Sequence, residues 1–131
     1  MQDQVSDKEL KKVIADFLEM GHVENILEMF KRDSSYYSWT GEILDDERFA
    51  VRLGVSVLFE ELKTLCPQDI QLAVPSLSRA LEESPPHVRG EAVNVLGIIG
   101  GEAALAAVKR ALADESPQVR EVAEDVLEDY R

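Results

Sequence analysis

Ala80–Arg89 has the sequence ALEESPPHVR and Ala111–Arg120 has the sequence ALADESPQVR, so one pattern returns with an offset of 31 residues, from position 80 to position 111. The match continues beyond the arginines, where the paired residues are Ala92 with Ala123, Val95 with Val126 and Leu96 with Leu127. A fixed period of this size is typical of stacked helical repeats, in which no unit buries its apolar face alone. We therefore expect an all-α fold, an α-α superhelix.

The composition agrees with a helical domain. The chain has 131 residues, a length that suits a single domain with a sizeable core. Aromatic residues make up 6% of it, while alanine, leucine and valine are plentiful, which favours close-packed helices over a sheet. We expect one α-solenoid domain over residues 1–131, with a divergent N-terminal hairpin and aromatic loop in 1–45 and repeats in 46–131.

The chain is strongly acidic. Its 26 aspartates and glutamates against 14 lysines and arginines give a formal net charge of -12. This charge opposes binding to nucleic acid and to anionic membranes, which both require clustered basic groups. The acidic residues form either a solvated surface or a docking surface for a basic partner. We expect the partner to be another protein, which has a basic surface if the acidic residues form a docking surface. We do not expect binding to nucleic acid or to a membrane.

Two features bear on the compartment. Cys66 is the single cysteine, so no disulfide can form within the chain, as is usual in a reducing compartment. Met1–Gln4 is polar rather than basic and apolar, and no apolar run reaches membrane-spanning length. We expect a cytoplasmic protein.

About seven antiparallel helices are expected, over approximately 7–20, 23–30, 49–65, 70–81, 86–99, 101–112 and 117–130. Ser6 and Glu9 match a capping box and predict the start of the first helix. Residues 49–65 carry apolar side chains in nearly every direction, which predicts a helix buried on all sides. Pro75 lacks a backbone donor, so the fourth helix should kink there or begin only near Leu72.

A charge pattern accompanies the repeat. An acidic residue stands six positions before an arginine three times, with Asp46 before Arg52, Glu83 before Arg89 and Asp114 before Arg120. Together with the segment 96–100 (LGIIG), these residues resemble HEAT repeats of the short, phycobilin-lyase-like type. The resemblance covers roughly 46–131. It implies a right-handed solenoid of antiparallel helix pairs, in which these acids and arginines form a ladder of hydrogen bonds between successive units.

The first unit departs from this pattern by a six-residue insertion, because Arg52 and Arg89 lie 37 positions apart whereas Arg89 and Arg120 lie 31 apart. The planar guanidinium of a ladder arginine also suits carboxylate or phosphate ligands. Repetition once per unit favours a structural role, since an active site needs different groups that converge at one place. Arg48 lies outside the pattern and is predicted to be solvated.

No catalytic or metal-binding set is visible. His22 and His87 are the only histidines, and neither precedes a glutamate, unlike the repeated His-Glu pairs of HEAT enzymes that resemble deoxyhypusine hydroxylase. Cys66 follows an apolar helix with no histidine nearby in sequence, so a buried side chain is favoured over a nucleophile or a bilin attachment point. We expect no catalytic residues, no metal and no cofactor.

Tyr36, Tyr37 and Trp39 form a cluster that the periodicity does not explain. Tyrosine and tryptophan are common in binding hot spots, which makes these three the candidate partner-binding residues. Alternatively, their rings fold back and cover the first helical hairpin.

The last expected helix has an acidic face between Glu121 and Asp129, opposite its apolar stripe. A polar outer face is what a terminal unit needs to stop further stacking. If Tyr130 and nearby apolar atoms stay exposed, the same end can instead support a weak homodimer. We therefore expect a monomer or a weak homodimer through this helix.

The sequence leaves the function open between several classes. HEAT arrays serve as scaffolds, as regulators and occasionally as enzymes, so the fold alone does not give the function. The leading hypothesis is a non-enzymatic protein-interaction or scaffold module that binds through its concave face or its aromatic segment. The alternatives are a tetrapyrrole (bilin) lyase or chaperone, which the resemblance implies, and, less favoured, a nucleic-acid-binding helical repeat.

Overall fold

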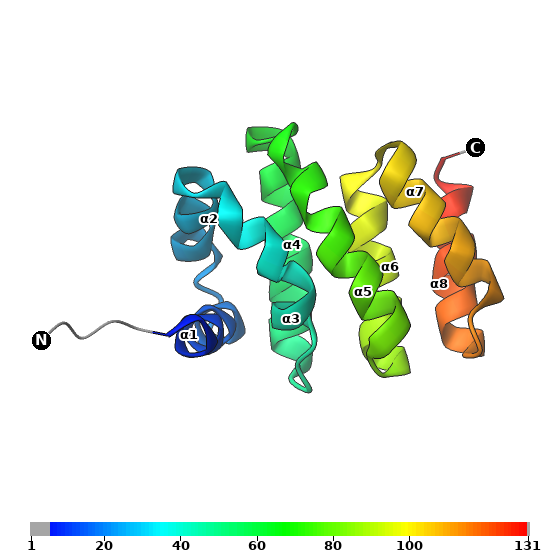
Figure 1. Ribbon diagram of the computed structural model, residues 1–131, viewed down its shortest axis with the longest axis horizontal. Coiled ribbons are helices and arrows are strands. Elements are labelled where there is room, and N and C mark those ends of the chain that lie inside the picture. Colours follow the sequence, from blue (N-terminus) through cyan, green and yellow to red (C-terminus); the bar gives the residue numbers. More distant parts are fainter. Residues whose placement is uncertain (1–5, 131) are drawn as a thin grey trace, which may run out of the picture.

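The computed structural model describes residues 6–130, and all regular structure in this range is helical (Figure 1). The elements are α1 (Asp7–Glu19), α2 (Val23–Arg32), η1 (Ser34–Trp39), α3 (Thr40–Leu44), α4 (Phe49–Leu65), η2 (Asp69–Ala73), α5 (Val74–Glu83), α6 (Pro86–Ile99), α7 (Gly101–Arg110), η3 (Ala111–Ala113) and α8 (Pro117–Glu128), where η marks a short 3-10 helix. The predicted all-α fold of packed helical repeats is confirmed. The α-helix not foreseen is the short α3.

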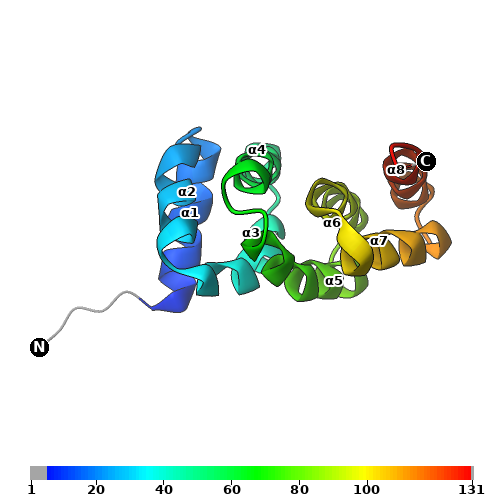
Figure 2. The ribbon, with the colours of Figure 1, turned by 90° about the horizontal axis from the view of Figure 1, so that it is seen from above.

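From α3 onward the helices form two rows (Figure 2). In one row α4 packs on α6 and α6 packs on α8, while α3, α5 and α7 form the other row. α6 is set back between α4 and α8, so these three helices line the concave side of the layer. We call α4, α6 and α8 the inner row, and α3, α5 and α7 the outer row.

The first two helices form a hairpin that packs on α4. The capping box is present, because the Glu9 amide donates to Ser6 Oγ (3.1 Å) and the Ser6 amide donates to Glu9 Oε1 (3.1 Å). Gly21 reverses the chain into α2 with a φ of 84°, a left-handed conformation that favours glycine. Gly54 lets α1 approach α4, since a Cβ there would lie 2.9 Å from Leu18 Cβ.

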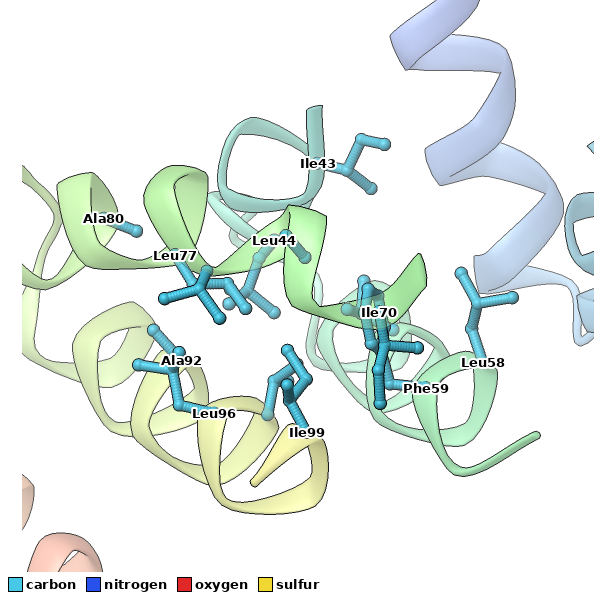
Figure 3. Close-up of a cluster of buried hydrophobic side chains, with 14 of the residues drawn as sticks. Ile43, Leu44, Leu58, Phe59, Ile70, Leu77, Ala80, Ala92, Leu96 and Ile99 are labelled. Carbon is cyan, nitrogen blue, oxygen red and sulfur yellow. The ribbon is translucent and has the colours of Figure 1, made fainter. Parts of the chain in front are cut away.

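The core lies between the two rows (Figure 3). Leu44 from α3, Leu77 from α5 and Leu96 from α6 are completely buried and lie close together. Successive units also interlock, because a Cβ on Gly97 of α6 would stand 2.7 Å from Val126 Cγ1 of α8. The 31-residue offset in the sequence is therefore the period of the packing, in which each unit buries its apolar stripe against the next.

One segment differs from the sequence prediction, and a second settles an alternative that the sequence left open. Residues 33–45, where the helical pattern breaks, form η1 and α3, and Leu44 at the end of α3 is fully buried. Of the two alternatives for Pro75, the later helix start is the one observed, because α5 begins at Val74, two residues after Leu72, and places the proline in its first turn without a kink. The backbone amide at that position has no partner within the helix, so the proline ring is tolerated there.

Candidate functional site

α4 exposes an apolar stripe on the concave side of the protein. Phe49, Leu53 and Val57 lie four residues apart on one face of the helix and are 60%, 49% and 42% exposed. Glu60, on the same face, lines a hollow shared with α6 and α8, which places the stripe on the inner side. The prediction that this helix is buried on all sides is wrong for this face, because the described elements pack on the flanks and back of α4 only.

Two hollows follow the length of α6. The first, about 440 Å³, lies between α4, α6 and α8 and includes Glu60, Gly97 and Asp129 in its wall. The second, about 340 Å³, lies between α6 and α8 and includes Gly90. Asn94 lines both hollows, so they are neighbours along α6. We use the term inner groove for the surface formed by Phe49, Leu53, Val57, Glu60, Gly90, Asn94, Gly97, Val122, Val126 and Asp129.

Acidic side chains outnumber basic ones in the two hollows. Glu60, Glu91 and Asp129 contribute carboxylates from the three inner helices, and Lys63 contributes the ammonium group. Of the inner-row arginines, Arg89 is paired with the Asp114 carboxylate, whereas Arg52 and Arg120 bind neutral backbone carbonyls and keep their positive charge near the starts of α4 and α8. The groove is therefore partly apolar and, on balance, negatively charged.

The ladder arginines bind the loops that precede their own helices. Each donates from Nη1 to backbone carbonyls five or six residues earlier, at 2.7–3.1 Å, with Arg52 bound to Asp46 and Glu47, Arg89 to Ser84, and Arg120 to Asp114 and Glu115. These bonds satisfy carbonyls in the tight turns and fix the start of each inner helix. The geometry is that of a repeated structural contact.

One acid–arginine rung links two units through both side chains. Arg89 of α6 donates from Nε (3.0 Å) and from Nη2 (2.9 Å) to the carboxylate of Asp114, which precedes α8. The two side chains are only 14% and 11% exposed. The hydrogen bond from Arg89 lowers the pKa of Asp114 below its usual value. The Ser116 amide also donates to this carboxylate (2.9 Å) and holds it in place.

Glu83 occupies the equivalent position one unit earlier, but its side chain is exposed and does not meet Arg89 or Arg52. In the next unit, the Ser116 amide holds the carboxylate of Asp114. The equivalent position after Glu83 is Pro85, which has no backbone N–H to donate. Arg52 Nε is consequently buried without a hydrogen-bond partner, and its guanidinium lies 5.7 Å from the centroid of the Phe49 ring. The predicted contact of Glu83 with the ladder is wrong.

Arg48 is the centre of an ion-pair network and not a solvated residue. Its Nη1 donates to Asp16 and Glu19 of α1 (both 2.8 Å), and its Nε and Nη2 donate to the Asp46 carboxylate (3.0 and 2.9 Å). The hydrogen bond from Arg48 lowers the pKa of Asp46 below its usual value. The carboxylate of Asp46 therefore pairs with Arg48 and not with Arg52, because the two-residue spacing lets it also accept the Arg48 amide (2.9 Å).

Of the aromatic cluster, Tyr37 lies in the core. It is 0% exposed, and its ring packs edge-on against Phe30 (5.0 Å between centroids) and Phe59 (6.1 Å). Its hydroxyl has no hydrogen-bond partner, and burial raises the pKa of this phenol above its usual value. Tyr37 therefore has no surface that a partner can contact, and its ring covers the first hairpin as the alternative interpretation expected.

Tyr36 and Trp39 are half-buried neighbours at the surface of η1. Their rings meet edge-on with 5.2 Å between centroids, and Lys11 Nζ lies 5.0 Å from the centroid of the Trp39 ring. The Lys11 ammonium also binds Glu42 (2.9 Å). These contacts attach η1 to α1 and α3, and they leave part of each ring open to solvent.

The histidines and the cysteine do not meet. His22 precedes α2 with its ring 5.8 Å from that of Phe17, His87 is exposed in the first turn of α6, and Cys66 is half-buried after α4. Within residues 6–130, no group of three histidine, cysteine or acidic side chains is placed to hold a metal ion.

Sequence reasoning missed the Arg48 network and the exposed stripe on α4. Arg48 follows three acidic residues in 45–47, a local pattern that could have indicated ion pairing. The spacing of Phe49, Leu53 and Val57 shows that they share a face, but it does not show that this face lacks a covering element.

Comparison with known proteins identifies the family. No helix in the described range is long and apolar enough to cross a membrane. A comparison with curated proteins and one with solved structures each gave no match. The family model described as HEAT repeats matches residues 38–128, without showing the phycobilin-lyase-like subtype. This match includes both rows and the whole ladder, and the chain belongs to the HEAT repeat family.

Proposed function

We propose that this protein is a non-enzymatic interaction module that binds a segment of another protein in its inner groove. HEAT repeats are generally protein-interaction modules. The observation that carries the proposal is the stripe of Phe49, Leu53 and Val57, which stays exposed on the concave side of an otherwise well-buried helix. Large apolar side chains that gather on one surface commonly mark an interaction site.

A partner that covers the stripe removes its apolar side chains from water. Covering the exposed half of a leucine or valine side chain is worth about 1 kcal/mol. Three adjacent side chains on one helix face therefore offer about 3 kcal/mol to a partner that fits them, before the costs of association. Among the described residues no other helix presents three large exposed apolar side chains on one face.

A matched pair of variants tests the proposal. Leu53 is 49% exposed in the groove, and Leu72 is 50% exposed in η2, outside it. Leu53→Glu and Leu72→Glu therefore make the same chemical change at equal exposure. In affinity capture from native lysate, with bound proteins quantified by mass spectrometry, we expect a set of proteins retained by the wild type and by Leu72→Glu and lost with Leu53→Glu. Capture that is equal for all three would contradict the proposal.

The other hypotheses have less support. Tyr36 and Trp39 remain candidate contact residues, but each ring is already half covered by the protein's own side chains. Bilin handling stays a prediction from the resemblance, and no observation on residues 6–130 favours it. Absorbance titration with a bilin tests it, since a lyase or chaperone of this class would shift the bilin spectrum.

A further inference from the structure

We infer that the segment received by the inner groove is a basic amphipathic α-helix of the partner protein. This inference rests on the proposed function and names the chemistry of the occupant. The observation behind it is that the residues at one pair of repeat positions differ in chemical character between α4, α6 and α8. The pair consists of the first and fifth residues after each ladder arginine.

This pair of positions has a different chemistry in each inner helix. The residues are Leu53 and Val57 in α4, Gly90 and Asn94 in α6, and Glu121 and Asp125 in α8. The positions are apolar in α4, small or uncharged in α6 and acidic in α8. Since equivalent positions in stacked repeats face the same side, the groove has an apolar wall, a low floor and an acidic wall.

The apolar wall fits a helix. From Phe49 to Val57 the helix rises by eight residue steps, about 12 Å along its axis at about 1.5 Å per step. Side chains spaced by four form the ridge that fits between the ridges of a second helix. A partner helix with apolar residues at i, i+4 and i+7 therefore matches this wall over about two turns.

The floor leaves room for the partner to come close. Gly90 has no side chain, and a Cβ placed there would meet Val122 Cγ2 at 3.8 Å, an ordinary contact distance, so the site has room for at least a methyl group. Asn94 is half-buried, and its Nδ2 donates to Ser56 Oγ (3.3 Å), which holds its side chain against α4. The two hollows along α6 are the result of these small or retracted residues.

The charge of the groove selects a basic occupant. Glu121 and Asp125 are exposed on α8, and Glu60, Glu91 and Asp129 line the hollows. A helix that places its apolar face on α4 directs its opposite edge toward the carboxylates of α6 and α8, where lysine or arginine side chains are attracted and acidic ones repelled. A second copy of this chain is disfavoured in the same place, because both groove surfaces would carry acid.

A defined peptide tests the inference. The probe is a fluorescently labelled 18-residue peptide of leucine and lysine with its leucines on one helical face, and binding is measured by anisotropy. Two control peptides replace every lysine with glutamate or scramble the order so that no apolar face forms. We expect saturable binding of the first peptide only, with affinity that falls as salt is added.

Matched charge reversals locate the binding. Glu121 is exposed on α8 at the repeat position equivalent to Leu53 and Gly90, and Glu82 is exposed on α5 in the outer row, so Glu121→Lys and Glu82→Lys change the net charge equally at different faces. We expect the dissociation constant to rise about tenfold with Glu121→Lys and with Leu53→Glu, and by less than about twofold with Glu82→Lys and Leu72→Glu. Circular dichroism of each variant confirms that it is folded.

Four outcomes would overturn the inference. The first two are absence of any peptide binding and equal binding of the acidic or scrambled peptide. The other two are equal loss of affinity from both charge reversals, and dimerisation of the protein alone that Leu53→Glu abolishes in analytical ultracentrifugation. The proposed function fails separately, when capture of lysate proteins does not depend on Leu53.

Discussion

Replacing Asp114 with alanine removes the acid–arginine rung that joins α6 to the turn before α8. Two hydrogen bonds from Arg89 to the carboxylate disappear (3.0 and 2.9 Å), together with the bond from the Ser116 amide (2.9 Å). The Arg89 guanidinium stays largely buried and keeps only its bond to the Ser84 carbonyl (2.8 Å). Loss of a mostly buried ion pair that leaves one charge behind should cost about 2–4 kcal/mol of unfolding free energy.

The matched control is Glu83→Ala, at the same repeat position one unit earlier. Glu83 is exposed and makes no bond to Arg89, so its replacement should change the unfolding free energy by less than about 0.5 kcal/mol. Urea unfolding followed by circular dichroism at about 222 nm measures the unfolding free energies of both variants. In thermal unfolding, Asp114→Ala should lower the melting temperature by roughly 10 °C. Equal effects of the two substitutions would refute the reasoning, because the sequence pattern alone treats the two acids as equivalent.

The rung also predicts a dependence on pH. The pKa of Asp114 is lower in the folded protein than in the unfolded chain, chiefly because of the hydrogen bond from Arg89. The unfolded chain therefore takes up the proton first as the pH falls. The stability from the rung is complete above the unfolded pKa of about 3.9 and is lost as the pH falls through the lower folded value. The difference in unfolding free energy between the wild type and Asp114→Asn should shrink from about pH 4 downward, and a constant difference down to about pH 2 would contradict this account.

Four further substitutions have definite expected outcomes. Arg48→Ala should destabilise the protein by about 1 kcal/mol, because the ion pairs of Arg48 are partly exposed. It should also speed amide hydrogen exchange in α1 more than in α8. An equal increase of exchange in α1 and α8 would contradict the place of Arg48 at the centre of the ion-pair network. Gly41→Ala should lower the unfolding free energy by about 1–3 kcal/mol, measured by thermal unfolding, because the added Cβ would clash with the Ser76 carbonyl oxygen. Gly90→Ala is the control. It should be neutral or stabilising by up to about 1 kcal/mol, because a Cβ fits there and alanine favours the helix. Tyr37→Phe should leave the melting temperature unchanged or raise it, since it removes a buried hydroxyl that has no partner, and a loss above about 1 kcal/mol would reveal a hydrogen bond.

Local features of the sequence determined most of the helices and the kind of fold. The capping box at Ser6 and the left-handed turn at Gly21 act within four residues, so their outcome does not depend on the rest of the chain. The repeat between 80–89 and 111–120 required equivalent helices to pack on one another, because each buries the same stripe. These signals predicted the fold class. They did not predict α3, because five residues are too few to show a helical period.

Only the tertiary structure decided how the candidate site is formed. Glu83 and Asp114 look equivalent in the sequence, yet only Asp114 meets an arginine, because a backbone amide in its own turn holds its carboxylate toward α6. Tyr37 is buried between α2 and α4, and the stripe around Leu53 is left exposed because no described helix lies above the inner row. A periodic pattern specifies which side chains share a face of a helix, whereas burial and pairing depend on what lies opposite that face, and that is set by contacts between residues far apart in the chain.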